Sequence, residues 1–295
     1  MKTSALTLAF AASTAFASAP SPGTSWKKTL FLDDFNGGSG SAPDSSKWIT
    51  QTGTSYPGGP PAWGTFEVET YTSSGNNVRQ AGNGDLWIIP RKSSSGKWTS
   101  ARLETRQSNF KAPAGGKLRV ETRIKMPNVS GASAAGYWPA FWALGGAFRG
   151  NYQNWPGVGE LDIMENVNGQ DTVSNVIHCD VNPGGICNES DGLGGTYSCS
   201  GSRCPGNYHI YEMVIDRSVS PERITFYVDR RAVRRVTATQ LGSVWNKTVN
   251  SGFYLILNVA MGGAYPDAVA GFKTPTTSTV SGREMAVDYV AVWST

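Results

Sequence analysis

The sequence predicts an all-β protein, a sandwich or jelly roll of antiparallel sheets. Three observations favour this class. Short apolar or alternating runs recur along the chain and are separated by Gly, Pro, Asn and Asp, which is typical of many strands joined by turns. No segment shows a convincing helical period of 3.6 residues. The 295 residues are rich in Gly (35), Trp (10), Tyr (11) and Phe (11), and this length suits one large all-β domain.

The chain begins with a pattern typical of a secretory signal peptide. Lys2 precedes a short apolar run and Ala-x-Ala patterns, which predict cleavage after Ala17 or Ala19. The run is well short of the ~20 apolar residues that cross a bilayer, which argues against a membrane anchor. We therefore expect a signal peptide over residues 1–19, a single domain over residues 20–295, and a secreted, extracellular protein that does not bind membranes.

The expected strands follow one another along the mature chain. They cover residues 85–92, 117–127, 209–216, 222–238, 253–261 and 285–293. In residues 117–127, Leu118 and Val120 alternate with Arg119 and Glu121, a period of two that buries one face of a strand. An Asp between two such runs in residues 222–238 predicts a hairpin.

Composition excludes two classes of function. The formal net charge is +4, only 16% of residues are charged, and no run of five or more Lys or Arg occurs, so a nucleic-acid partner is not indicated. The abundance of aromatic residues argues against disorder. We expect a monomer.

The cysteines and sequons fit secretion. An even, clustered set of cysteines in an oxidising compartment predicts two disulfides. The four residues are Cys179, Cys187, Cys199 and Cys204. Three pairings are possible, and closure between near neighbours favours the first with the second and the third with the fourth. A zinc site is disfavoured because no Cys-x-x-Cys pair occurs. Glycosylation sequons stand at Asn128, Asn188 and Asn246.

One strand carries three acids. Residues 159–166 read GELDIMEN, so Glu160, Asp162 and Glu165 alternate with large apolar side chains. On a regular strand the first two share a face and Glu165 points to the other, among buried residues. An unpaired carboxylate there costs on the order of several kcal/mol. A β-bulge near positions 163–164 would return Glu165 to the face of the other acids. The sequence therefore predicts a bulge, a row of three acids and an apolar layer beneath it.

Such a row could cleave a glycosidic bond. With the bulge, the outer Cα atoms lie ~13 Å apart, and side chains that lean inward bring the Glu160 and Glu165 carboxyls to roughly 5–6 Å, near the ~5–5.5 Å of retaining glycosidases. Asp162 between them could couple their titrations. A solvated edge, a chance alignment and a Ca²⁺ site are alternatives, although the apolar spacers do not suit a calcium loop.

The motif Glu-x-Asp-x-x-Glu, preceded by Trp155-Pro156, resembles the active-site strand of glycoside hydrolase family 16 in its bulged, laminarinase-like form. Segments such as GYWPAFWALG, FYLILNVAMGG and MAVDYVAVW resemble other strands of this family in the same order. The resemblance implies a β-jelly roll of two curved antiparallel sheets, with a concave cleft that holds a polysaccharide and cuts it internally.

The resemblance also implies roles for individual residues. Glu160 would be the nucleophile and Glu165 the general acid/base with the higher pKa of the pair, while Asp162 would hydrogen-bond the nucleophile. His178 falls where laminarinase-like members place a histidine beside the acids, so we place it among the substrate-binding residues. A structural strand histidine is the alternative for His178.

Tryptophans are expected to stack on sugar rings, whose faces are apolar. Trp155 aligns with a substrate-binding Trp of the family. Trp138 and Trp142 share one face of a strand because they are four residues apart, and core packing of one of them is an equal alternative. Trp63 is near the cleft only by analogy with the family.

The function implied is a secreted, retaining endo-hydrolase of β-1,3 linkages, with laminarin-type glucan favoured and mixed-linked β-1,3-1,4-glucan a further substrate. The Cys-rich segment after His178 is longer than in the plain laminarinase pattern, which keeps an endo-β-1,3-galactanase as the alternative enzyme. A non-catalytic glucan-binding lectin is the alternative of another class, although such relatives lose the acids. Transglycosylation is less favoured because it accompanies the unbulged motif.

No cofactor is expected to be required for catalysis. Some family members carry a structural Ca²⁺ on the convex face near the chain ends. Asp34 and Asp288 could serve as its ligands here, but each also suits a surface turn or sheet edge, so we assign no metal site.

Overall fold

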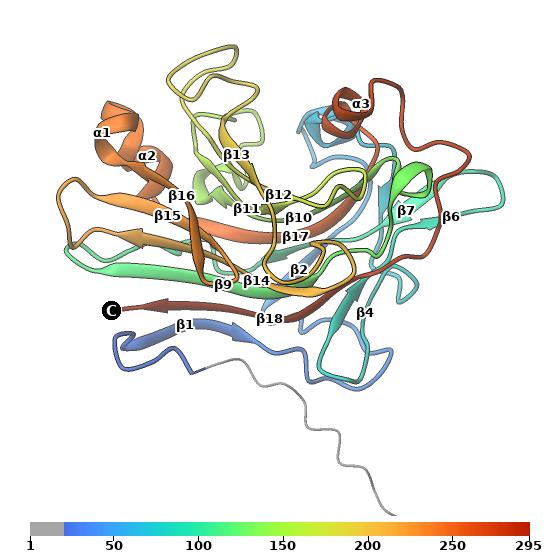
Figure 1. Cartoon of the computed structure of the whole chain (residues 1–295), viewed down its shortest axis with the longest axis horizontal. Coiled ribbons are helices and arrows are strands. Elements are labelled where there is room, and N and C mark those ends of the chain that lie inside the picture. Colours follow the sequence, from blue (N-terminus) through green and yellow to red (C-terminus); the bar gives the residue numbers. More distant parts are fainter. Residues whose placement is uncertain (1–20) are drawn as a thin grey trace, which may run out of the picture.

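The computed structural model describes residues 21–295, and the expected signal peptide lies outside this range. Two antiparallel sheets stack as curved layers (Figure 1), and three short strands form a separate ribbon. The expected all-β sandwich is confirmed. Among residues 21–295, no helix combines the length and apolarity that crossing a bilayer requires.

Sheet 1 lies on the side of the chain termini. Its order is β16 (Arg231–Thr237), β15 (Arg223–Val228), β14 (Tyr208–Asp216), β9 (Lys117–Lys125), β18 (Met285–Ser294), β5 (Leu86–Ile88) and β4 (Val78–Gln80), with β1 (Lys28–Asp33) beside β18. Sheet 2 has the order β13 (Leu193–Tyr197), β12 (Val173–His178), β11 (Glu160–Glu165), β10 (Tyr137–Gly145), β17 (Phe253–Met261), β8 (Arg102–Thr105) and β2 (Trp48–Gln51).

Smaller elements connect the sheets. The ribbon contains β3 (Thr70–Tyr71), β7 (Trp98–Ser100) and β6 (Arg91–Lys92). The α-helices are α1 (Ala238–Leu241), α2 (Trp245–Val249) and α3 (Ala264–Ala270), and the 3-10 helices are η1 (Pro61–Gly64), η2 (Gly131–Ala134), η3 (Gly146–Phe148) and η4 (Gly242–Val244). The α-helices have only four, five and seven residues, too few to show an apolar period in the sequence.

Turn chemistry sets the expected hairpin. β15 and β16 pair in an antiparallel ladder, and the two residues between them, Asp229 and Arg230, both have positive φ, at 50° and 63°. Two left-handed residues in a row are what a two-residue type I′ hairpin requires. The Asp that marked this turn in the sequence therefore occupies a position that favours Asp.

β17 explains why sheet 2 has two apolar faces. All nine of its residues are buried. Leu255, Leu257 and Val259 belong to the main core between the sheets, whereas Tyr254 and Ile256 belong to a second cluster. That second cluster packs against Trp63, Trp142, Tyr152 and Trp155. The face of sheet 2 that points away from sheet 1 is thus lined with aromatic rings.

Candidate active site

β11 contains the expected bulge. Met164 and Asp162 face consecutive residues of β10, so Ile163 is an extra residue. The register with β12 shows the same irregularity between Asp162 and Glu165. Leu161, Ile163 and Met164 are all buried in the main core, because the bulge turns two successive side chains inward. The predicted irregularity, with its apolar layer, is confirmed.

The three acids share one pocket. Glu160, Asp162 and Glu165 all line a pocket of about 350 Å³ on the aromatic face of sheet 2. The backbone before them is fixed by Gly159, which has a φ of +83° and whose Cβ, if present, would lie 2.6 Å from the carbonyl oxygen of Thr248. A side chain there would clash, so glycine allows β11 to start where it does.

Each outer carboxyl has its own indole donor. Trp155 Nε1 donates a hydrogen bond to Glu160 Oε2 at 3.1 Å, and Trp138 Nε1 donates to Glu165 Oε1 at 2.7 Å. The two tryptophans therefore hold the carboxyls in place while their rings contribute to the pocket wall. Their expected role as sugar platforms stays a prediction.

Trp142 also lies in the pocket wall rather than in the core. Its Nε1 donates to Asn258 Oδ1 at 2.8 Å, Asn258 Nδ2 donates to the Tyr71 hydroxyl at 3.0 Å, and that hydroxyl donates to Glu67 Oε2 at 2.7 Å. This polar chain fixes the ring. Core burial of either Trp138 or Trp142, the alternative left open by the sequence, is not what the structure shows.

His178 lies beside the acids, on the face of sheet 2 that they share. It faces Glu160 across the β11–β12 ladder. Its Nε2 lies 3.5 Å from Asp162 Oδ2, and its Nδ1 lies 2.7 Å from Glu189 Oε2. The sequence placed His178 among the substrate-binding residues; the structure places it against Asp162, and its side chain is absent from the described pocket lining.

Burial and mutual charge interactions shift the pKa values of the three acids. Burial raises the pKa of Glu160 to about 7, with His178 opposing and the charge of Glu165 adding to the rise. Burial, followed by the charges of both glutamates, raises the pKa of Asp162 well above its usual value, and burial also raises the pKa of Glu165. Groups coupled in this way titrate as a unit. Both pKa values are raised, and the expected order, with the pKa of Glu165 above that of Glu160, stays a prediction.

Sequence reasoning missed Arg102 on the pocket floor. Its side chain is almost fully buried, and the guanidinium carbon lies 5.3, 4.9 and 4.8 Å from the ring centres of Tyr56, Trp63 and Trp142. Its Nε donates to Glu104 Oε1 at 3.2 Å, which pairs the buried charge. A signal existed: from Ala101 into β8, Arg102 and Glu104 alternate with buried Ala and Leu, so both charged residues share the pocket face. Trp63, expected near the cleft only by analogy, does line the pocket.

The described residues offer no convincing metal site. Two groups bring acids, histidine or cysteine together: Glu160 with Asp162 and His178, and Cys199 with His209 and Asp229. Both ring nitrogens of His178 already face carboxylates, and Cys199 is in a disulfide and has no thiolate to offer. Of the two residues considered for calcium, Asp288 accepts a hydrogen bond from Arg123 at 2.8 Å. A structural calcium ion stays a prediction.

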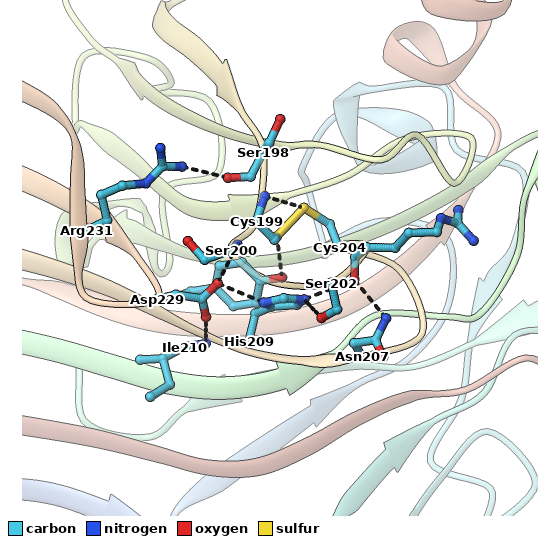
Figure 2. Close-up of polar contacts among 12 residues, drawn as sticks. Ser198, Cys199, Ser200, Ser202, Cys204, Asn207, His209, Ile210, Asp229 and Arg231 are labelled. Carbon is cyan, nitrogen blue, oxygen red and sulfur yellow. Dashed lines mark hydrogen bonds and ion pairs between the residues drawn. A yellow bond between two sulfur atoms is a disulfide. The ribbon is translucent and has the colours of Figure 1, made fainter.

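The disulfides match the favoured pairing. Cys179 bonds Cys187 and Cys199 bonds Cys204. The first disulfide closes the loop that directly follows β12, and Asn182 of this loop lines the pocket. The second lies in a separate polar cluster around His209 (Figure 2), whose residues are absent from the described pocket lining.

Cleavage of a glycosidic bond needs two carboxyl groups in one site. On β11, Glu160 and Glu165 form such a pair, each with its own indole donor, in a pocket lined with aromatic rings. The class of protein that this fold and pocket define is a glycoside hydrolase. Residues 90–192 match the model of the XgeA-like catalytic domain of family 16. Together with the relatives below, this match shows that the chain belongs to glycoside hydrolase family 16.

Two solved structures cover nearly the whole chain. The chain is 55% identical to an endo-1,3-beta-glucanase from Streptomyces sioyaensis, with a TM-score of 0.91 over 94% of this chain and 99% of that one. It is 31% identical to the endo-beta-1,3-glucanase from Pyrococcus furiosus, with a TM-score of 0.70 over 91% and 94% of the two chains.

A curated relative is longer than this chain. Glucan endo-1,3-beta-glucosidase A1 from Niallia circulans is 31% identical over 92% of this chain, but the match spans only 38% of that protein. The similarity is therefore to one part of that relative.

Proposed function

We propose that the protein is a retaining endo-hydrolase of β-1,3-linked glucan of the laminarin type. The observation that carries this proposal is the bulged strand, which sets Glu160 and Glu165 on one face of an aromatic pocket. The names of the relatives support the substrate class, since both solved structures are endo-1,3-β-glucanases.

The geometry supports a double displacement. The Glu160 carboxylate attacks the anomeric carbon while Glu165 donates its proton to the departing glycosidic oxygen, which leaves a glycosyl ester on Glu160. Glu165, now ionised, then takes a proton from a water molecule whose oxygen attacks the same carbon, and Glu160 leaves. Both carboxyls end in their starting states. Burial favours this exchange because the raised pKa values keep a proton available in the site near neutral pH.

Asp162 lies between the two glutamates in sequence and on the same face. Its carboxyl is almost fully buried, and the charges of Glu160 and Glu165 favour its protonated form. A protonated Asp162 can donate a hydrogen bond to the nucleophile and hold it in position. We infer that Asp162 orients Glu160 and shares the proton of the trio.

Secretion is part of the proposal. Both disulfides fit folding in an oxidising compartment, and the sequence pattern of residues 1–19 fits export. Glycosylation at the sequons and a monomeric state remain predictions of the same kind.

An endo-β-1,3-galactanase is the second candidate, favoured by the disulfide-closed loop that contributes Asn182 to the pocket wall. Digestion of laminarin, lichenan and debranched arabinogalactan, with identification of the oligosaccharides, separates the two. We expect internal cleavage of laminarin. Release of galactose oligosaccharides with inert laminarin would replace the first candidate by the second, and chain-length redistribution without new reducing ends would indicate transglycosylation.

A further inference from the structure

Glu189 is a buried acid that no motif identified. It stands two residues after the loop closed by the Cys179–Cys187 disulfide and pairs with Gly184 of that loop, and its side chain has no exposed surface. Its Oε1 accepts the backbone N–H of Cys179 at 2.6 Å. Its Oε2 lies 2.7 Å from Nδ1 of His178. The carboxylate is therefore tied to the start of that loop and to the histidine at the end of β12.

The other side of the His178 ring faces a catalytic acid. Nε2 lies 3.5 Å from Oδ2 of Asp162, and this oxygen is buried with no closer hydrogen-bond partner in the described part of the chain. Gly192 makes room for the ring, because a Cβ there would lie 2.8 Å from Cε1 of His178. Oxygen acceptors on both sides of a ring favour a proton on both nitrogens, which is the imidazolium. The proton proposed above for Asp162 then lies on Oδ1, so that Oδ2 remains an acceptor.

The charges around the ring agree with this reading. Burial disfavours the charged form of His178, but the hydrogen bond to Glu189 and the charges of Asp162, Glu160 and Glu189 outweigh it and raise the pKa to about 10. The groups that face the ring are Glu160 and Asp162 from β11, Glu189 from the segment after the disulfide loop, and the neutral ring of Trp155 at 5.6 Å. In return, the positive charge of His178 lowers the pKa of each of the three acids of β11.

We propose that Glu189 is a positioning residue for the hydrolysis proposed above, on which this role rests: it holds a charged His178 ring against Asp162, so that the segment after the disulfide loop fixes a positive charge beside the cleft acids. Glu189 touches no substrate in this arrangement. It acts through the histidine.

Removal of the Glu189 charge should weaken the hold on the imidazolium. With the ring no longer held against Asp162, the cation lowers the pKa of Glu160 less, and the nucleophile ionises only at higher pH. The lost charge of Glu189 also acts directly on Asp162, in the opposite direction, but this influence is smaller than that of His178. The net expectation is an acid limb of the kcat/KM profile that moves to higher pH.

The chain supplies a matched control outside the pocket (Figure 2). Asp229 Oδ2 lies 2.8 Å from Nδ1 of His209, and the Nε2 of that ring donates to the carbonyl oxygen of Arg203 at 3.0 Å. Asp229 also accepts backbone N–H groups, those of Ser200 and Ile210. Asp229→Asn therefore removes the charge of a second His–carboxylate pair, whose residues are not among the described pocket-lining residues.

The test is the pH dependence of kcat/KM on laminarin oligosaccharides for the wild-type protein, Glu189→Gln, Glu189→Asp and Asp229→Asn, with the Tm of each. We expect the acid limb of Glu189→Gln to rise by about one pH unit, which is about tenfold in kcat/KM on the acid side. Glu189→Asp should recover part of this loss, and Asp229→Asn should keep the wild-type limb even where its Tm falls. An unmoved limb in Glu189→Gln, or an equal movement in Asp229→Asn, overturns the proposal.

A second measurement needs only the wild-type protein and therefore tests the proposal even if Glu189→Gln fails to fold. In the wild-type protein, ¹⁵N NMR of the histidine rings at about pH 8 should show His178 with both nitrogens protonated, since its pKa is raised to about 10. A neutral His178 ring at that pH overturns the proposal. Inert laminarin with a charged ring would instead contradict the proposed function and leave the charge arrangement standing.

Discussion

The two histidines of the chain lie in nearly the same local arrangement and yet serve different ends. Each has Nδ1 on a carboxylate, at 2.7 Å from Glu189 for His178 and at 2.8 Å from Asp229 for His209. Each lies beside a disulfide-closed loop. They differ on the far side of the ring, where His178 meets Asp162 and His209 meets a backbone carbonyl. The same histidine–carboxylate pair therefore lies beside the catalytic acids in one place and beside loop backbone groups in the other.

The largest contrast is between the cleft acids and Asp229. We expect Glu160→Gln and Glu165→Gln each to lower kcat on laminarin by about 10³-fold or more, because each removes a group that forms or breaks a bond. Laminarin affinity, measured by affinity electrophoresis, should survive. Asp229→Asn should keep kcat within about twofold. Near-normal turnover in either glutamine variant would contradict the assignment, and azide should rescue Glu165→Ala on activated substrates.

The histidines themselves give the next contrast. His178→Ala should lower kcat/KM by roughly 10–100-fold, because the acids lose the cation that favours their ionised forms. His209→Ala should leave kcat/KM nearly unchanged but destabilise the fold by about 1–3 kcal/mol, since buried hydrogen-bond partners lose their donor. Steady-state kinetics and thermal unfolding of both variants measure this. Equal losses of activity would remove the distinction between the two clusters.

The two disulfides allow the same comparison, with smaller expected losses of activity. The bonds join residues 8 and 5 positions apart, so loss of either one should destabilise the protein by about 2 kcal/mol. Activity should separate them: the double variant Cys179→Ser/Cys187→Ser frees the loop that pairs with Glu189 through Gly184 and should lose several-fold in kcat/KM on the acid side. Cys199→Ser/Cys204→Ser should not. Indistinguishable pH profiles would show that the first bond does not matter for the site.

The smallest expected effect is a gain in stability. The folded-state pKa of Glu160 is raised from 4.5 to about 7, so the group stabilises the fold most when protonated, and this contribution is lost as the pH rises through about 7. Glu160→Gln cannot ionise and should exceed the wild-type Tm by about 2–5 °C at pH 8, with a smaller difference at pH 4.5. Calorimetry at both pH values checks the sign. A Tm below that of the wild type at pH 8 would mean that the ionised carboxylate is well accommodated.

The sequence was sufficient for β11 because its alternation of acidic and apolar residues breaks at a single point, Ile163–Met164. Three acids among Leu161, Ile163 and Met164 left an unpaired buried charge unless the strand carried one extra residue, and the register shows that residue. The cysteine pairing followed from proximity along the chain. In both cases the deciding residues are close in sequence.

The features of the site that the sequence did not predict depend on contacts between segments that are distant in the chain. Arg102 and Tyr56 meet on the pocket floor from separate segments, and no local pattern links them. His178 lies beside the acids, as expected, but the sequence does not reveal which carboxylates its ring faces, and its substrate-binding role stays a prediction. Glu189 carries no motif, and its burial follows from the path of a loop.

The most direct test of the bulged-strand assignment is the configuration of the first product. ¹H NMR of laminarin oligosaccharide hydrolysis, recorded before mutarotation, reports the anomer that is released. Two carboxyls close enough for a covalent glycosyl intermediate on Glu160 predict that the β-anomer forms first. Initial release of the α-anomer would show inversion by a single displacement and would contradict the roles given to Glu160 and Glu165.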